Sequence, residues 1–234
     1  MNKWWLMMIT VSLIVVCITV GFCQKGGTGA MSEQTVRLPQ PRKEGRLSVE
    51  AAIARRRSCR EFTEAPLTRQ QVGQVSWAAQ GVTGQGGRKR AVPSAGATYP
   101  LSIFLAVGEK GVNGISTGVY RYRPDEHQLE AHASRDVRRE VARAALGQSF
   151  LAQAPVVVLI AANYARTARR YGDRARRYVH MEAGHASENI YLQAEAEGLC
   201  TVAVGAFNDE QVSEVFNLPE QFAPLYLMPI GHPE

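Results

Sequence analysis

The sequence has little cysteine, and its cysteines lack the spacing of a metal site. Two of the four lie among the first 23 residues, which leaves Cys59 and Cys200 for the rest of the chain. No Cys-x-x-Cys pair occurs, and no Cys/His set has ligand spacing, so zinc and iron–sulfur sites are disfavoured. We predict that Cys59 and Cys200 are packing residues; a disulfide between them is possible.

A concentrated basic tract is also missing. The net charge is +6, but the arginines are dispersed and no zinc-finger or RNA-recognition signature accompanies them. We therefore expect solvated basic faces and one anionic cofactor, with no nucleic-acid partner. Apolar residues are plentiful, at 45% of 234 residues, and charged residues make up 21%. One large domain can be built from this chain, which is neither disordered nor a coiled coil.

Residues 4–23 contain no charged side chain. Twenty apolar-biased residues are about the length that spans a hydrocarbon core, so residues 1–23 are expected to be a signal or anchor segment. Residues 24–46, rich in Gly, Pro and charge, are expected to be a linker to a domain at 47–234. The domain is then membrane-tethered or exported to the cell envelope; cleavage within 1–30 and the side of the membrane stay open.

Within the domain, helices and strands are interspersed. Ser48 is expected to cap a helix, and Thr68 to open another that ends at Gly81. Further helices are predicted at 136–146, 174–197 and 209–216, and strands at 102–107, 117–123, 127–131, 155–162, 201–204 and 225–230. The apolar run 155–162 indicates a strand buried on both faces. The pattern predicts an α+β fold with a mixed sheet.

Three segments carry the chemistry. Arg55-Arg56-Arg57-Ser58-Cys59-Arg60 concentrates guanidinium groups that can bind a phosphate or a heterocycle bidentately. The segments 93–100 (Pro-Ser-Ala-Gly-Ala-Thr-Tyr-Pro) and 198–207 (Gly-Leu-Cys-Thr-Val-Ala-Val-Gly-Ala-Phe) follow in order. Together with Gly118-Val119-Tyr120-Arg121-Tyr122, they resemble the FMN-dependent nitroreductase superfamily, in the SagB/ThcOx-type dehydrogenase branch. The resemblance covers residues 47–232.

The resemblance implies a mainly antiparallel sheet flanked by helices, with a long central helix, in an intertwined homodimer that binds FMN. It assigns the flavin phosphate, ribityl chain and pyrimidine edge to Arg56, Arg57, Ser58 and Arg60. It implies that a loop of the partner subunit approaches the flavin through Pro93, Ser94, Ala95 and Gly96. A backbone N–H near flavin N5 would come from Val204, Gly205 and Ala206.

The chain departs from the family pattern at three places. Val204-Gly205 stands where many nitroreductases have Glu-Gly, so a carboxylate contribution there is lost. At the C-terminus only His232 offers a late basic group, and we favour a surface tail over a phosphate contact. No Lys-Tyr dipeptide occurs, although azoline-oxidising relatives use such a pair, so peptide azoline oxidation is in doubt.

We expect no catalytic side chain, because a flavin carries out hydride transfer itself. No metal site is expected either, since His180 and His185 project about 140° apart on a helix. The expected function is hydride transfer from a donor such as NAD(P)H to an organic acceptor by ping-pong exchange. The alternatives are an oxygen-coupled dehydrogenase of a peptide or small molecule, and a membrane-tethered flavin-binding protein without turnover.

Overall fold

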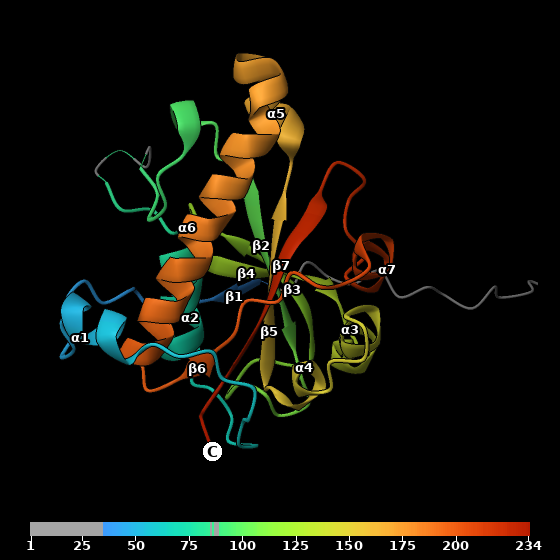
Figure 1. Cartoon of the computed structure of the whole chain (residues 1–234). Coiled ribbons are helices and arrows are strands. Elements are labelled where there is room, and N and C mark those ends of the chain that lie inside the picture. The colour runs from blue at the N-terminus through green and yellow to red at the C-terminus, as the bar shows by residue number, and fades with distance from the viewer. Residues whose placement is uncertain (1–34, 85, 87–88) are drawn as a thin grey trace, which may run out of the picture. The chain divides into compact units, whose positions relative to one another are not determined.

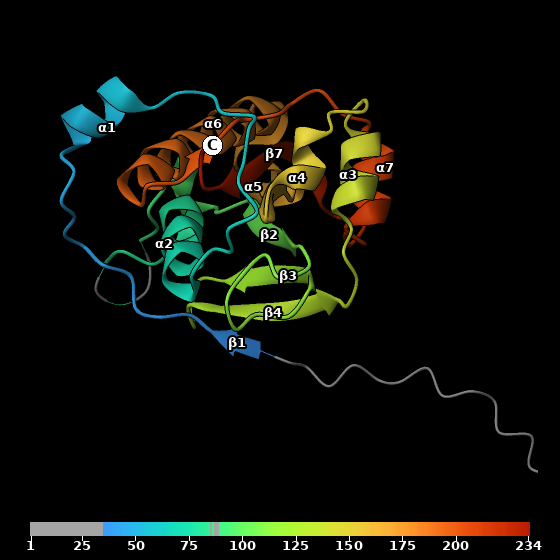
Figure 2. The same cartoon turned by 90° about the horizontal axis from the view of Figure 1, so that it is seen from below.

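A computed structural model of the chain describes residues 35–84, 86 and 89–234. Seven strands form one sheet in the order β1-β4-β3-β2-β5-β7-β6 (Figures 1 and 2). The strands are β1 Thr35–Arg37, β2 Leu101–Val107, β3 Gly118–Arg123, β4 Gln128–Ala133, β5 Val156–Ala162, β6 Cys200–Thr201 and β7 Ala223–Gly231.

All pairs of these named strands are antiparallel. Parallel pairing is limited to single bridges, Ser58 with Thr201 and Leu67 with Val112. The predicted α+β class is confirmed. Strand β1 lies inside the range predicted as a linker and pairs with β4 at the edge of the sheet; the outer bounds of that linker stay a prediction.

Helices cover both faces of the sheet. They are α1 Val49–Arg55, α2 Arg69–Gln80, α3 Arg138–Ala144, α4 Phe150–Gln153, α5 Tyr164–Tyr171, α6 Ala175–Ala196 and α7 Asp209–Val215, with short 3-10 turns at Ala95–Ala97 and Gly172–Arg174. Figure 2 shows α2 and α6 on one side of the central strands and α3, α4 and α7 on the other. The long central helix is therefore present as predicted.

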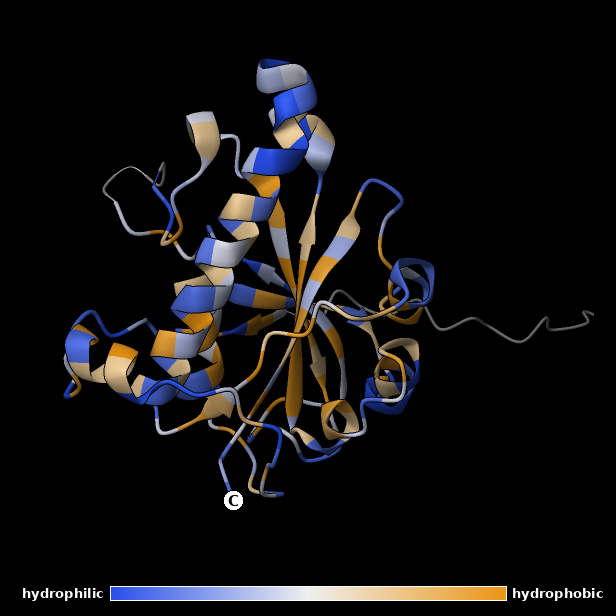
Figure 3. Ribbon diagram, in the orientation of Figure 1, coloured by the Kyte–Doolittle hydropathy of each residue, from blue (hydrophilic) through white to orange (hydrophobic). Residues whose placement is uncertain are grey.

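The central strands are buried on both faces, which explains their continuous apolar sequence. In β5, Val156, Val158 and Ile160 pack into the core beneath α2 and α6, whereas Val157 and Leu159 pack beneath α3 and α7. Every residue of β5 is buried. Figure 3 shows the same apolar character along the strands. The prediction for residues 155–162 is confirmed, because a period of two sends alternate side chains into two cores.

The helix starts follow capping rules. Ser48 accepts a hydrogen bond from Ala51 N, and Thr68 forms a full capping box with Gln71 at the start of α2. Helix α1 nevertheless leaves Val49 and Ile53 57% exposed. Three elements were not predicted: β1, which has only three residues, α4, which has only four, and α5, whose start is marked by Asn163 accepting from Ala165 N.

A buried histidine fastens the chain after β1 to the sheet. His127 is 8% exposed, and its Nε2 donates to Pro39 O at 2.9 Å, which leaves Nδ1 to accept from Tyr122 Oη at 2.8 Å. Leu38 N also donates to His127 O. Burial lowers the pKa of His127, and the bond to the Pro39 carbonyl opposes this effect in part. The neutral form of the His127 imidazole therefore stabilises the contact between the chain after β1 and the sheet.

Among the described residues, no helix combines the length and hydropathy that a membrane crossing requires. The signal or anchor segment predicted at residues 1–23 lies outside the described residues.

Because the pKa of His127 is lower in the folded protein, the unfolded chain binds more protons below about pH 6.5, the ordinary histidine pKa. Stability should therefore fall as the pH drops below that value. His127→Gln should weaken this dependence and cost about 1–3 kcal/mol at neutral pH, since Pro39 O and Tyr122 Oη lose their partner. Urea unfolding at several pH values measures both effects. The exposed His185→Gln variant, as a control, should keep the wild-type slope; an unchanged slope in His127→Gln would contradict the prediction.

Candidate functional site

The arginine-rich segment follows α1 directly. The chain turns at Arg56, where the backbone leaves helical geometry. The Arg56 guanidinium lies 5.2 Å from the centre of the Tyr191 ring, and the Arg57 Nη1 donates to the carbonyls of Ala54 and Arg56. These contacts orient the guanidinium groups without neutralising them.

No carboxylate pairs with these arginines in the part of the chain that the structure describes. The ion pairs in that part involve other residues, and Arg60 lies over the Phe150 ring at 5.7 Å. Arg57, Ser58 and Arg60 are exposed and Arg56 is half-buried. Guanidinium groups without carboxylate partners, beside a hydroxyl, form a donor set suited to a phosphate or a polarised carbonyl.

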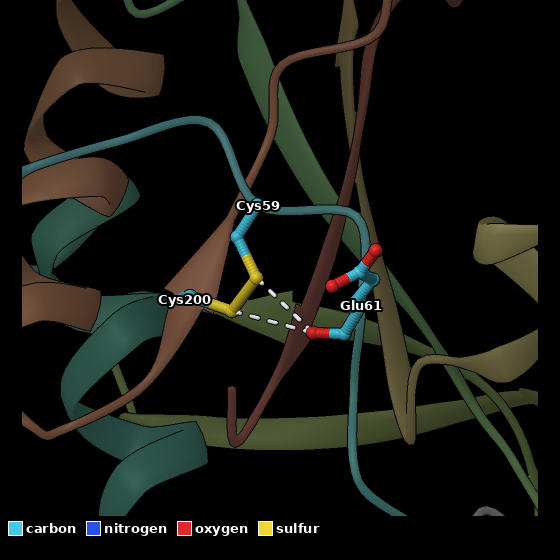
Figure 4. The surroundings of a disulfide bond; sticks show 3 residues. All are labelled: Cys59, Glu61 and Cys200. Atoms are coloured by element: carbon cyan, nitrogen blue, oxygen red, sulfur yellow. Dashed lines mark hydrogen bonds between the residues drawn. A yellow bond between two sulfur atoms is a disulfide. The ribbon is translucent and has the colours of Figure 1, made fainter. Parts of the chain in front are cut away.

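The same segment is joined to the chain after α6. Cys59 N donates to Thr201 O at 3.0 Å, and Ser58 pairs with Thr201 in a parallel bridge. Cys59 and Cys200 form a disulfide, and the Glu61 carbonyl oxygen lies 3.2 Å and 4.0 Å from their sulfurs (Figure 4). The preferred interpretation of both cysteines as packing residues was wrong, and the disulfide that the sequence left open is present. Their separation of 141 residues hides the pairing, which depends on the tertiary fold.

Tyr191 of α6 was missed by the sequence analysis as a site residue. Its hydroxyl lies 3.1 Å from Ser58 Oγ and accepts a hydrogen bond from Ala203 N at 2.8 Å. The Arg56 guanidinium lies over the ring of the same tyrosine. The helical pattern placed Tyr191 among core residues, because an amphipathic side chain at a core position gives no separate signal.

Only part of the predicted segment Val204–Ala206 can offer a free backbone N–H. Val204 N donates to Leu227 O, and Leu227 N returns a bond to Val204 O, both at 2.9 Å. Gly205 and Ala206 are exposed, and their N–H groups make none of the hydrogen bonds recorded between described residues. A Cβ on Gly205 would meet only Tyr226, at 3.8 Å. The open donors thus belong to Gly205 and Ala206.

The C-terminal tail lies beside the arginine segment. Thr63 N donates to His232 O at 3.0 Å, and Phe62 pairs with Pro233. A cavity of about 390 Å³ here is lined by Ser58, Cys59, Arg60, Glu61, Pro233 and Glu234. Its two carboxylates make it a poorer phosphate site than the open side of Arg56 and Arg57. A phosphate contact by His232 stays a hypothesis.

The loop at residues 93–96 lies elsewhere, against the first half of α6, and its own chain holds it in shape. Ser94 Oγ accepts from Tyr99 N at 2.9 Å, and Arg170 Nη1 donates to Gly96 O at 3.2 Å. Gly96 has a φ of +58°, and a Cβ there would lie 2.7 Å from Tyr171 Oη. The positive φ and the nearby ends of the Tyr171 and Arg170 side chains therefore favour glycine at position 96, whatever binds nearby.

One chain does not bring the predicted site residues together. The loop lines a cavity with Glu182 of α6, whereas Ser58 contacts Tyr191 of the same helix. Nine residues of helix separate these positions by about 14 Å along its axis. The structure therefore joins Ser58 and Cys59 to Thr201 and, through Tyr191, to Ala203, whereas Pro93, Ser94 and Ala95 lie with Glu182 in a second cluster.

Three comparisons bear on this arrangement. Residues 53–232 match the family described as the Nitroreductase family. A nitroreductase-family protein of Methanocaldococcus jannaschii is 48% identical over 185 residues, which cover 79% of this chain and 91% of that protein. A nitroreductase structure from Ralstonia eutropha superposes with a TM-score of 0.75 at 30% identity, covering 87% of this chain and 91% of that one. The microcin B17-processing protein McbC of Escherichia coli is 29% identical over 150 residues, 62% of this chain and 55% of McbC.

The disulfide should contribute strongly to stability. Closing a loop across a separation of 141 residues corresponds to about 5 kcal/mol in the chain-entropy account, and measured losses are typically 2–5 kcal/mol. We expect the double variant Cys59→Ser, Cys200→Ser to unfold at lower urea concentration, and reductant to bring the wild type to the same midpoint. Equal midpoints with and without reductant, or two free thiols in the unreduced folded protein, would contradict the prediction.

Proposed function

The chain belongs to the nitroreductase family and is an FMN-dependent oxidoreductase, and we propose that it passes hydride from a donor such as NAD(P)H to an organic acceptor as a homodimer. Bound FMN would accept hydride from the donor and give it up to the acceptor in a second, separate step. The protein's own residues bind and orient the cofactor and shape the cavity for the acceptor. The following contacts support this assignment.

The observation that carries the proposal is the junction of two segments far apart in sequence. Ser58 and Cys59 pair with Thr201, and Tyr191 connects Ser58 to Ala203, so the arginine segment is joined to the segment that leads to the open N–H groups of Gly205 and Ala206. A flavin needs this combination, because its phosphate is anionic and its reduced ring places negative charge at the pyrimidine edge. The buried Thr201 Oγ1 also has no hydrogen-bond partner among the described residues. These residues fit FMN.

We propose that Arg56, Arg57 and Arg60 bind the phosphate and the pyrimidine carbonyls, with Ser58 on the ribityl chain. The Tyr191 hydroxyl would hold Ser58 in place through the contact at 3.1 Å. Gly205 or Ala206, rather than Val204, would direct an N–H at the ring, since Val204 N is already bonded to Leu227 O.

The separation of the two clusters supports the proposed homodimer. The loop of the same chain lies about 14 Å along α6 from Tyr191. If Pro93, Ser94, Ala95 and Gly96 approach the flavin, a second copy of the chain must therefore supply them. Exposed apolar side chains lie on α1, which precedes the arginine segment, and on α6, which packs against the loop. Val49 and Ile53 on α1 are each 57% exposed, and Met181 on α6 is 54% exposed. Such residues are suited to a subunit interface.

A second function, oxidation of a peptide or small molecule with oxygen as acceptor, is favoured by the similarity to the microcin-processing protein McbC. The missing Lys-Tyr dipeptide weighs against azoline oxidation in particular. A flavin-binding protein without turnover is the third alternative.

We also propose that the domain works in an oxidising compartment, exported or tethered through residues 1–23. The Cys59–Cys200 disulfide supports this, since structural disulfides persist mainly outside the reducing cytosol. The uncharged segment 4–23 of the sequence supports it independently.

The first test removes the charge of the arginine segment. Arg56→Ala with Arg60→Ala should weaken FMN binding about a hundredfold or more, because charge-assisted hydrogen bonds are worth about 1.5–3 kcal/mol each. The matched control, Arg139→Ala with Arg143→Ala on α3, removes two exposed arginines far along the chain and should retain wild-type affinity. Flavin fluorescence titration measures the dissociation constant. Equal affinity in the two double variants would refute the assignment.

The second test concerns turnover. The FMN-loaded protein should lose its oxidised-flavin absorbance under anaerobic conditions when NADH or NADPH is added, and regain it when a quinone is added. Stopped-flow spectroscopy follows both half-reactions. Reduction by dithionite but by neither nicotinamide would overturn the proposed donor and favour one of the two alternatives.

A further inference from the structure

A buried carboxyl on α6 has no role in the site described so far. Glu182 is 2% exposed, yet none of the ion pairs recorded among the described residues includes it. Its Oε1 is buried and has no hydrogen-bond partner within the described part of the chain. A buried acid with one unpartnered oxygen is costly to the fold, which favours a chemical use as the explanation for its presence.

Glu182 lines a cavity that reaches the surface. The cavity has a volume of about 310 Å³; its wall is made by the loop residues Pro93, Ser94 and Ala95 and by Tyr178, Met181, Glu182 and His185 of α6. Met181 and His185 are exposed, so the cavity is open at that side. Pro93, Ala95 and Met181 supply apolar surface, and Glu182, Ser94 and the two ring side chains supply the polar groups. Such a cavity suits a flat organic molecule with one polar edge.

The state of the carboxyl is set mainly by burial. Burial raises the pKa of Glu182 to about 7, while the Ser94 hydroxyl and the Gln80 amide of α2 oppose the rise. The nearby titratable groups are Tyr178 and His185 on the same helix. From the α5 end, Arg170 donates to Gly96 O and Tyr171 packs on the Tyr178 ring. Near neutral pH the carboxyl can therefore both give up a proton and take one back.

We propose that Glu182 is the proton donor to an acceptor bound in this cavity. The inference rests on the proposed function, in which the loop 93–96 faces the flavin of the partner subunit. A quinone or related conjugated carbonyl acceptor gains two electrons and one hydrogen as hydride supplied through the flavin. It also needs one proton on its oxygen. The Glu182 O–H bond breaks to supply that proton, and the resulting carboxylate takes a proton from water through the open side of the cavity.

The main test compares two acceptors in Glu182→Gln. Benzoquinone needs a proton when it is reduced, whereas ferricyanide takes single electrons and no proton. The ratio of the benzoquinone rate to the ferricyanide rate should fall about a hundredfold or more, the usual effect of losing a general acid. The exposed Glu188→Gln on the same helix is the matched control and should keep the wild-type ratio. An unchanged ratio in Glu182→Gln would refute the proposal.

A second readout needs neither flavin nor turnover. Infrared spectra of the flavin-free protein should show the carbonyl stretch of a protonated carboxylic acid that disappears as the pH rises through about 7. The band should be missing in Glu182→Gln. In Gln80→Leu it should persist to higher pH, because an amide that favours the carboxylate is removed. If Glu182→Gln does not fold, the shift in Gln80→Leu still tests whether the band belongs to Glu182. A titration at the ordinary pKa of glutamate would contradict the proposal.

The two hypotheses fail in different ways. A wild-type protein that binds no FMN, or reduces neither acceptor, refutes the proposed function, and with it the role of Glu182, even if the infrared band is present. Normal flavin binding and turnover with an unchanged acceptor ratio in Glu182→Gln refutes only the proton-donor proposal.

Discussion

The pairing of residues 58–63 with two distant parts of the chain organises the candidate flavin site. Backbone bonds join Cys59 to Thr201 and Thr63 to His232, and the disulfide to Cys200 locks the first of these. Without this pairing, the guanidinium groups that follow α1 would lie on an untethered segment. Ordering that segment would then cost conformational entropy each time a ligand bound. With this pairing, the segment that carries the donors is joined to Thr201 and Ala203 before any ligand arrives.

The elements that the sequence predicted well have strong local signals. The run Val156–Ala162 has no polar residue and could only be a fully buried strand, and Thr68 with Gln71 specifies a helix start through two reciprocal bonds. The long helix at Ala175–Ala196 is likewise recovered within one residue at each end. Strand β1 and helix α5 were missed because three residues and eight residues give too little periodicity.

The site was harder to predict than the fold, because its contacts join segments far apart in the chain, and neither segment's sequence indicates which other segment it will contact. The motifs indicated Arg56 and Gly205, but nothing in them indicates that Tyr191 connects Ser58 to Ala203. The burial of Glu182 also depends on the loop at 93–96 packing against α6. In the same way, Gly96 was predicted to let the backbone approach the flavin, whereas its positive φ and the nearby Tyr171 and Arg170 side chains of its own chain already favour glycine there.

The disulfide also changes the topology of the domain. Cys59 and Cys200 close a covalent ring that contains β2, β3, β4 and β5, the four consecutive strands that include the most deeply buried ones. The segments outside the ring, β1 at one end and β7 at the other, pair with strands inside it. Cleavage of a single peptide bond anywhere between the two cysteines would leave both pieces attached. The disulfide would thus hold the domain together covalently after a single proteolytic cut within this ring.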